Sequence, residues 1–177
     1  MGCVLAAACS GPPTSPSDPV LVAGMTTIGF NSAADNGSNF AIHRESGYVV
    51  QPLDGPWVVV TTFGHPAPFI QFTRTASTDT VGEVQVFADG AGFRFSAVDL
   101  YSSITPIPYV FEGYLREQRV FRVAGTVPNT FGNFATVRNP NGENLLTTLL
   151  IRLTNPSPCI IGTCPNPVGL DNIVVGR

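Results

Sequence analysis

Charged residues are scarce in this 177-residue sequence. They make up only 12% of it, and none is a lysine. An average globular domain carries roughly 25% charged residues. The formal net charge is −3 at pH 7. Because nucleic-acid-binding proteins need a basic surface to neutralise phosphates, the composition argues against nucleic acid as a partner.

Long apolar runs are missing as well. A helix that crosses a membrane needs about 20 consecutive, mainly apolar residues. No such run follows the N-terminal segment of the chain. We therefore expect no transmembrane segment.

Catalytic signatures are the third absence. The sequence contains no serine nucleophile elbow, zinc motif or phosphate-binding loop. Its histidines, His43 and His65, have no partner at a catalytic spacing. A glycosidase needs two carboxylates held a few ångströms apart, and Asp99 and Glu112, in neighbouring predicted strands, are the best pair. We expect a protein without catalysis, with a glycosidase or lyase as the disfavoured alternative.

Apolar residues, by contrast, make up 44% of the chain, which also has 18 glycines and 16 prolines. A chain of this length and apolar content can bury a sizeable core. We expect one folded β-sandwich domain over residues 20–177, after an N-terminal segment of a different kind.

The N-terminal segment, residues 1–19, has the composition of a targeting sequence followed by a linker. Leu5–Cys9 (LAAAC) resembles the end of a bacterial lipoprotein signal, which predicts lipidation of Cys9; an alanine-rich terminus without a signal is the alternative. Ser10–Pro19 (SGPPTSPSDP) predicts an extended linker. Both features favour export to an extracellular or cell-surface location, where Cys9 would provide a lipid anchor.

The clearest strand pattern begins at Phe93. Phe93 and Phe95 share one face of a strand, but the next apolar pair, Val98 and Leu100, has the opposite phase. A β-bulge near Ser96–Ala97 would reconcile the two phases, because the extra residue turns the strand.

Short alternating segments of this kind recur along the whole domain, separated by turn sequences such as Asn36-Gly37. They predict roughly nine to eleven strands and no helix. Ala88–Gly92 is expected to close a hairpin into the strand that follows, and Gln118–Ala124 to pair with the strand before it. The predicted fold class is all-β, an antiparallel two-sheet jelly-roll sandwich, with a closed barrel as the alternative.

Cys159 and Cys164 lie five positions apart in a proline-containing loop. In an exported protein, a local disulfide between them would pin this loop. A metal site is the alternative, but it would need four ligands and the chain has only two histidines to contribute. The ligand count favours the disulfide.

Hard oxygen ligands gather near the last predicted strand. Asp171 and Asn172 begin that strand, and Asn31 would face them if the first and last strands are neighbours. Calcium prefers carboxylate, amide and carbonyl oxygens, so the three residues are candidate ligands of a structural Ca²⁺. The alternative is that Asp171 caps a turn by accepting backbone N–H groups.

Three segments of the chain show a family pattern: FRFSAVDLYSS at 93–103, GTVPNTFGNFATV at 125–137 and GLDNIVV at 169–175. In these segments the sequence resembles the secreted bacterial β-sandwich domains of galactose-binding-like or carbohydrate-binding-module type, which recur among exported proteins with PEP-type sorting signals. The resemblance implies a jelly-roll sandwich, often with a calcium ion that joins the first and last strands. Asp171 would hold that ion together with Asn31, where many such domains have an acidic residue.

Carbohydrate binding, or adhesion to a cell-surface polymer, is the function that these features favour. Sugars stack their apolar faces on aromatic rings. Phe63 and His65 lie in a rigid loop, and Phe87 and Tyr114 fall on the outward phase of their strands. Trp57 is a further candidate ring. The alternative is a structural subunit of a surface layer or filament, which would form homo-oligomers through its sheet edges.

Overall fold

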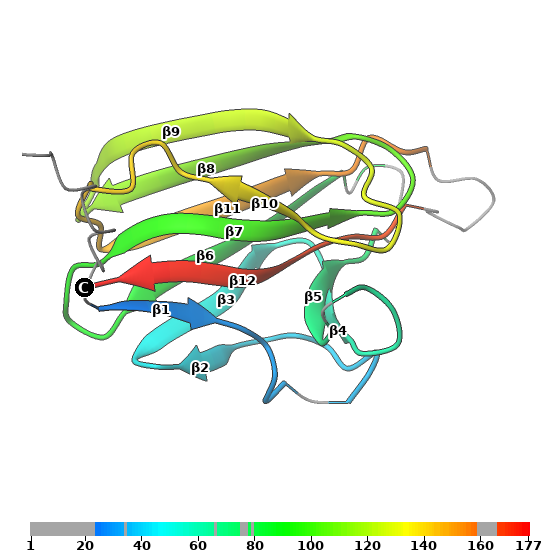
Figure 1. Ribbon diagram of the computed structural model, residues 1–177, viewed down its shortest axis with the longest axis horizontal. Coiled ribbons are helices and arrows are strands. Elements are labelled where there is room, and N and C mark those ends of the chain that lie inside the picture. Colours follow the sequence, from blue (N-terminus) through cyan, green and yellow to red (C-terminus); the bar gives the residue numbers. More distant parts are fainter. Residues whose placement is uncertain (1–23, 34, 66, 75–77, 79, 159–165) are drawn as a thin grey trace, which may run out of the picture.

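The computed structural model describes residues 24–33, 35–65, 67–74, 78, 80–158 and 166–177. These residues form two antiparallel sheets of six strands each, packed as a sandwich (Figure 1). The all-β, antiparallel two-sheet prediction is confirmed, while the twelve strands exceed the predicted range by one. The strands are β1 (Met25–Ile28), β2 (His43–Glu45), β3 (Tyr48–Asp54), β4 (Trp57–Val60), β5 (Phe69–Phe72), β6 (Val81–Ala88), β7 (Arg94–Ser102), β8 (Ile107–Leu115), β9 (Gln118–Val127), β10 (Ala135–Arg138), β11 (Thr148–Thr154) and β12 (Val168–Gly176).

The first sheet, sheet A, has the order β10-β7-β12-β5-β4, and β1 pairs with β12 outside this path. β12 is therefore central, because β7 lies along one side of it while β5 and then β1 share the other side. The change from β5 to β1 falls between Leu170 and Ile173. Ile28 pairs with Ile173, so the first and last strands are neighbours, as the calcium prediction required.

The second sheet, sheet B, has the order β2-β3-β6-β11-β8-β9. β8 and β9 form the predicted hairpin. The hairpin predicted at Ala88–Gly92 is wrong, since β6 belongs to sheet B and β7 to sheet A. Phe93, at the end of this connection, pairs with Leu146, and both residues are fully buried. Burial between the sheets thus takes precedence over the local turn signal.

Two irregularities interrupt the β7–β12 ladder. In the first, Ser96 is an extra residue on β7, since Ala97 and Phe95 face the consecutive residues Val174 and Val175. The predicted bulge is confirmed, and it brings both apolar phases of the strand into the core.

The second irregularity lies on β12, where the pairing steps from Asp171–Asp99 to Val174–Ala97. Asn172, within this step, has a φ angle of 47°. Asparagine is one of the few residues other than glycine that adopt this left-handed conformation readily. The bulge places an asparagine side chain next to Asp99, to which its amide donates a hydrogen bond of 3.0 Å.

The core lies between the two sheets and consists of side chains that alternate inward along each strand. Full burial of one large apolar side chain contributes about 1.5–3 kcal/mol, so this core is the main source of stability. The described residues contain no helix that is long and apolar enough to cross a membrane. The largest fully buried side chains are Trp57, Phe30, Phe69, Phe72, Phe93, Phe95, Phe111, Ile28, Ile70, Leu100, Ile107 and Leu146.

Candidate functional site

Two of the predicted ligand-binding residues, Phe63 and His65, line an open cleft of about 570 Å³. Residues of the loop after β4 and of the loop between β9 and β10 line this cleft. The two loops lie at the same end of the sandwich (Figure 1). Phe63 is 40% exposed and His65 is also exposed, so both side chains reach solvent. The described lining residues are Thr61, Thr62, Phe63, Gly64, His65, Ala67, Phe131, Gly132 and Asn133.

Phe131 is the cleft residue that sequence reasoning missed. It is 77% exposed, and its φ angle of 49° is unusual for a bulky side chain. Phe63 and Phe131 are the exposed phenylalanines of the chain, and they line the same cleft. The sequence signal for Phe131 is its place in a loop, between Asn129 and Gly132, outside any strand pattern that would bury its side chain.

Backbone hydrogen bonds hold the two loops of the cleft together. The His65 N–H donates to the Gly132 carbonyl at 3.1 Å, and the Asn133 N–H donates to the Thr130 carbonyl at 3.1 Å, which closes the turn. The Thr130 N–H donates in turn to the Ser102 carbonyl of β7 at 2.7 Å. The wall that carries Phe131 is therefore anchored to sheet A.

The opposite wall rests on a small aromatic cluster. The Phe63 ring lies with its centroid 5.7 Å from that of Phe69 and 6.1 Å from that of Tyr101, both of which are buried. Gly64 has a φ angle of 81°, and a Cβ atom there would lie 2.8 Å from the Phe69 ring. Glycine is thus required at this position by both its backbone conformation and the close approach of Phe69.

Phe87 and Tyr114 lie on a different surface, the outward side of sheet B, on either side of Thr148. Both are half-buried. Because neighbouring strands are about 4.8 Å apart, the two backbones lie about 10 Å apart. We call this surface the sheet B face; its central residues are Gln51, Glu83, Gln85, Phe87, Glu112, Tyr114, Thr148, Leu150 and Arg152.

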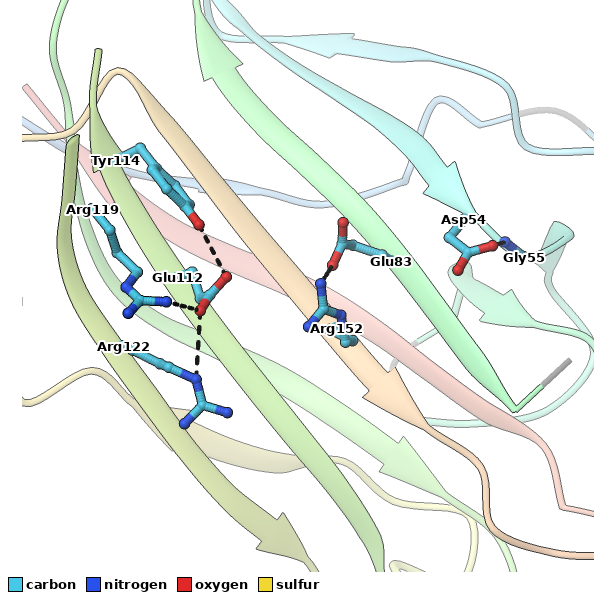
Figure 2. A network of polar contacts seen from close by, with 8 residues as sticks. All are labelled: Asp54, Gly55, Glu83, Glu112, Tyr114, Arg119, Arg122 and Arg152. Atoms are coloured by element: carbon cyan, nitrogen blue, oxygen red, sulfur yellow. Dashed lines mark hydrogen bonds and ion pairs between the residues drawn. The ribbon is translucent and has the colours of Figure 1, made fainter. Parts of the chain in front are cut away.

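Glu112 is the centre of a polar network on the sheet B face (Figure 2). Its Oε1 lies 2.8 Å from the Arg119 guanidinium and 3.4 Å from that of Arg122, and its Oε2 accepts a hydrogen bond of 3.1 Å from the Tyr114 hydroxyl. Partial burial, followed by the hydrogen bond and charge of Glu112, raises the pKa of Tyr114. The Tyr114 hydroxyl therefore stays protonated at neutral pH.

Two further polar pairs complete the sheet B face. Glu83 and Arg152, directly opposite each other on β6 and β11, form an ion pair of 2.5 Å (Figure 2). The Gln51 amide donates to the Gln85 carbonyl oxygen at 2.9 Å. Only 11% of the Glu83 side chain is exposed. These groups are held by their partners before any ligand arrives.

Trp57 is not available to stack on a ligand. It is 2% exposed and packs against Phe72, with ring centroids 5.9 Å apart. Its indole N–H donates to the Asp54 carbonyl at 3.0 Å. The prediction that Trp57 is a binding surface is therefore wrong, because its inward strand phase places it in the core.

Asp171 is buried where the neighbour of β12 changes from β5 to β1. It is 3% exposed, and its carboxylate accepts backbone N–H groups of Asn172 and Phe30. Burial raises the pKa of Asp171 to about 6, and the charges of Asp99 and Glu45 add to this effect while the two N–H groups oppose it. One carboxylate oxygen, Oδ1, has no hydrogen-bond partner.

The predicted calcium ligands do come near one another, since the amides of Asn31 and Asn172 both lie within 4 Å of the position that a Cβ atom of Gly29 would occupy. The unpartnered Asp171 oxygen fits a hard cation. However, the described residues contain no group of three or more His, Cys, Asp or Glu side chains that could hold a metal ion. Calcium at Asp171, Asn31 and Asn172 stays a prediction.

The remaining sequence candidates divide into two groups. Asp99 lies in sheet A and Glu112 in sheet B, so the strands that carry the nominated carboxylate pair are not neighbours. Cys9, Cys159 and Cys164, and with them the predicted lipidation and disulfide, lie outside the described residues.

No protein-family model matches the chain, and no curated protein matches it in sequence. A DUF4465 family protein from Bacteroides caccae has a similar structure, with 9% identity and a TM-score of 0.52 over 86% of this chain and 99% of that one. A family 29 carbohydrate-binding module aligns with 12% identity and a TM-score of 0.46 over 88% of this chain and 92% of that one. A family 61 module in complex with β-1,4-galactotriose aligns with 11% identity and a TM-score of 0.43 over 84% and 94%. At these identities the likeness concerns the β-sandwich fold alone.

Proposed function

We propose that this protein is a carbohydrate-binding module without catalysis, and that its sheet B face binds a linear, uncharged polysaccharide. One observation carries the proposal: a single strand surface combines two aromatic rings with paired arginine, glutamate and glutamine side chains.

The aromatic rings supply the apolar contact that a sugar needs. Phe87 and Tyr114 lie in one row across β6, β11 and β8, separated by Thr148. A polysaccharide that crosses the strands would therefore meet both rings. The strand backbones that carry the two rings lie about 10 Å apart, which is comparable to the length of a disaccharide unit.

The paired polar groups supply hydrogen bonds to sugar hydroxyls. Gln85 and Glu112 lie in the row next to the rings, on either side of Leu150, and Arg152 lies in the row beyond. An arginine has five N–H donors and a carboxylate has about four acceptor sites, so each group can serve its partner and a ligand together. Because these side chains lie on strands and already contact partners, little side-chain entropy is lost when a ligand binds.

The charge balance of the face favours an uncharged ligand. Both carboxylates of the face are paired with arginine, Glu112 with Arg119 and Arg122 and Glu83 with Arg152 (Figure 2), so a ligand would find neither carboxylate unpaired. The Glu83–Arg152 pair contributes little net stability, because desolvation of the nearly buried Glu83 carboxylate offsets its attraction to Arg152, which is 41% exposed. Since stability does not explain the pair, we assign it a role in binding, in which it holds its polar groups in position for a ligand.

We further propose that the protein works outside the cell, at the surface or in the extracellular space. The lipoprotein-like Leu5–Cys9 and the linker after it support this location.

Affinity electrophoresis of the full chain in gels that contain a neutral mannan, galactan, xylan or β-glucan tests the proposal. We expect at least one polymer to retard the protein, and Phe87→Ala and Arg152→Met each to weaken binding at least tenfold, about 1.4 kcal/mol. Arg94→Met is the matched control, because Arg94 lies in sheet A, where its Nε donates to the Glu143 carbonyl at 3.3 Å and lies 4.0 Å from the exposed Glu143 carboxylate. Retardation by none of the polymers, or unchanged binding in both face variants, would overturn the proposal.

A further inference from the structure

We infer that the cleft lined by Phe63 and Phe131 is a second binding site, which accepts one uncharged sugar ring such as a glycan chain end or branch. The cleft and the sheet B face share no residue. The inference therefore does not depend on the function proposed for that face.

Phe131 is the first reason. With 77% of its side chain exposed, it gains little from burial in the folded protein. Its φ angle of 49° adds backbone strain, because a bulky side chain disfavours this left-handed conformation. An aromatic residue that is both exposed and strained is not explained by folding, whereas a ligand that covers its ring would explain it.

The chemistry of the lining is the second reason, because it selects the class of ligand. Hydroxyl, imidazole and amide groups of Thr61, Thr62, His65 and Asn133 accompany the two rings, and the described lining residues include no carboxylate or guanidinium. An acidic ligand would find no cation there. A purely apolar ligand would cover these polar groups and leave them without hydrogen-bond partners, which is unfavourable. A sugar ring has an apolar face and hydroxyls at its edge, and so matches both parts of the lining.

The size and stiffness of the cleft are the third reason. Its volume of about 570 Å³ falls within the range of about 300–1,000 Å³ that small-molecule sites have. One wall is tied to the other by the His65–Gly132 hydrogen bond, and Phe63 rests on buried Phe69 and Tyr101. These contacts hold both walls in place, so little conformational entropy is lost when a ligand binds between them.

The test uses the full chain and the methyl glycosides of glucose, galactose, mannose and xylose, titrated by saturation-transfer NMR and calorimetry. We expect at least one glycoside to bind, and Phe131→Ala and Phe63→Ala each to lower its affinity at least tenfold. Ile42→Ala is the matched control, because Ile42 is an apolar residue, 51% exposed, that does not line the cleft. Melting curves followed by Trp57 fluorescence verify that each variant is folded.

Two results would overturn the inference: no glycoside binds, or binding survives in both Phe131→Ala and Phe63→Ala. Glycoside binding that is lost in Phe87→Ala instead would also overturn it and would assign the sugar to the sheet B face. Polysaccharide retardation measured in the same variants keeps the two proposals separate, because the sheet B face predicts sensitivity to Phe87→Ala and none to Phe131→Ala.

Discussion

Asp171 lies directly opposite Asp99 in the β12–β7 ladder. The two carboxylates differ in their surroundings. Asp99 accepts a hydrogen bond of 2.5 Å from the Thr136 hydroxyl and one of 3.0 Å from the Asn172 amide, whereas Asp171 is buried with its Oδ1 unpartnered. Like charges placed opposite each other destabilise a sheet. The ionisation of this pair should therefore make the stability of the fold depend on pH.

The first prediction concerns pH. The folded-state pKa of Asp171, about 6, lies above the ordinary value of 3.8. The folded state therefore prefers the protonated form, and its stabilisation is fully present below about pH 4 and lost as the pH rises to about 6. We expect Asp171→Asn to melt several degrees above the natural protein at neutral pH, with a smaller difference at about pH 4. Thermal unfolding with a chelator present measures this; an equal difference at both pH values would contradict it.

The second prediction concerns calcium. An ion held by Asp171, Asn31 and Asn172 would neutralise the buried carboxylate and bind only the folded state, so added calcium should raise the melting temperature of the chelator-treated protein. Asp171→Asn should not respond. If calcium does not raise the melting temperature of the natural protein, the calcium prediction is wrong. An equal rise in the melting temperature of Asp171→Asn would mean that the ion binds at another site.

The third prediction compares two glycines of the cleft. Gly64 and Gly132 have φ angles of 81° and 91°, but a Cβ atom at Gly64 would lie 2.8 Å from Phe69 and one at Gly132 would meet nothing within 4 Å. Gly132→Ala should therefore cost about 1 kcal/mol of backbone strain. Gly64→Ala should cost about 1–3 kcal/mol more, because the cluster beneath Phe63 must shift. Urea unfolding of both variants gives the difference; equal costs would mean that Phe69 moves aside freely.

The fourth prediction separates stability from binding at Glu83 and Arg152. Arg152→Met leaves the nearly buried Glu83 carboxylate without its partner, and we expect it to destabilise the fold by about 1–3 kcal/mol. The double variant Glu83→Met/Arg152→Met should recover most of that loss, but it should not recover polysaccharide binding. Denaturant unfolding and affinity electrophoresis of the single and double variants test this. A double variant that binds normally would show that the pair has no part in recognition.

Much of the fold could be predicted from the sequence because alternation along a strand is a local property. The change of apolar phase after Phe95 located the bulge at Ser96, and the β8–β9 hairpin followed from two adjacent alternating segments. The connection at Ala88–Gly92 could not be predicted in the same way. Its turn residues suit either a hairpin or a crossing between sheets, and the choice depends on the distant pairing of Phe93 with Leu146.

The candidate sites were predicted less completely, for a related reason. An outward strand phase correctly indicated Phe87 and Tyr114 as surface residues, and inward phase should have excluded Trp57. Loops have no such phase. Phe63 and Phe131 line one cleft because the folded sheets bring two loops to the same end of the sandwich. No spacing in the sequence indicates that these loops are close.

The position of β12 in sheet A has a consequence for biosynthesis. β12 follows every other strand that the structure describes, yet it joins β7 on one side to β1 and β5 on the other. During translation, sheet A cannot close until residues 168–176 have left the ribosome. Sheet B, whose last member is β11, can assemble earlier. The pairs of sheet B can therefore form while sheet A still lacks the strand that connects β7 to β1 and β5.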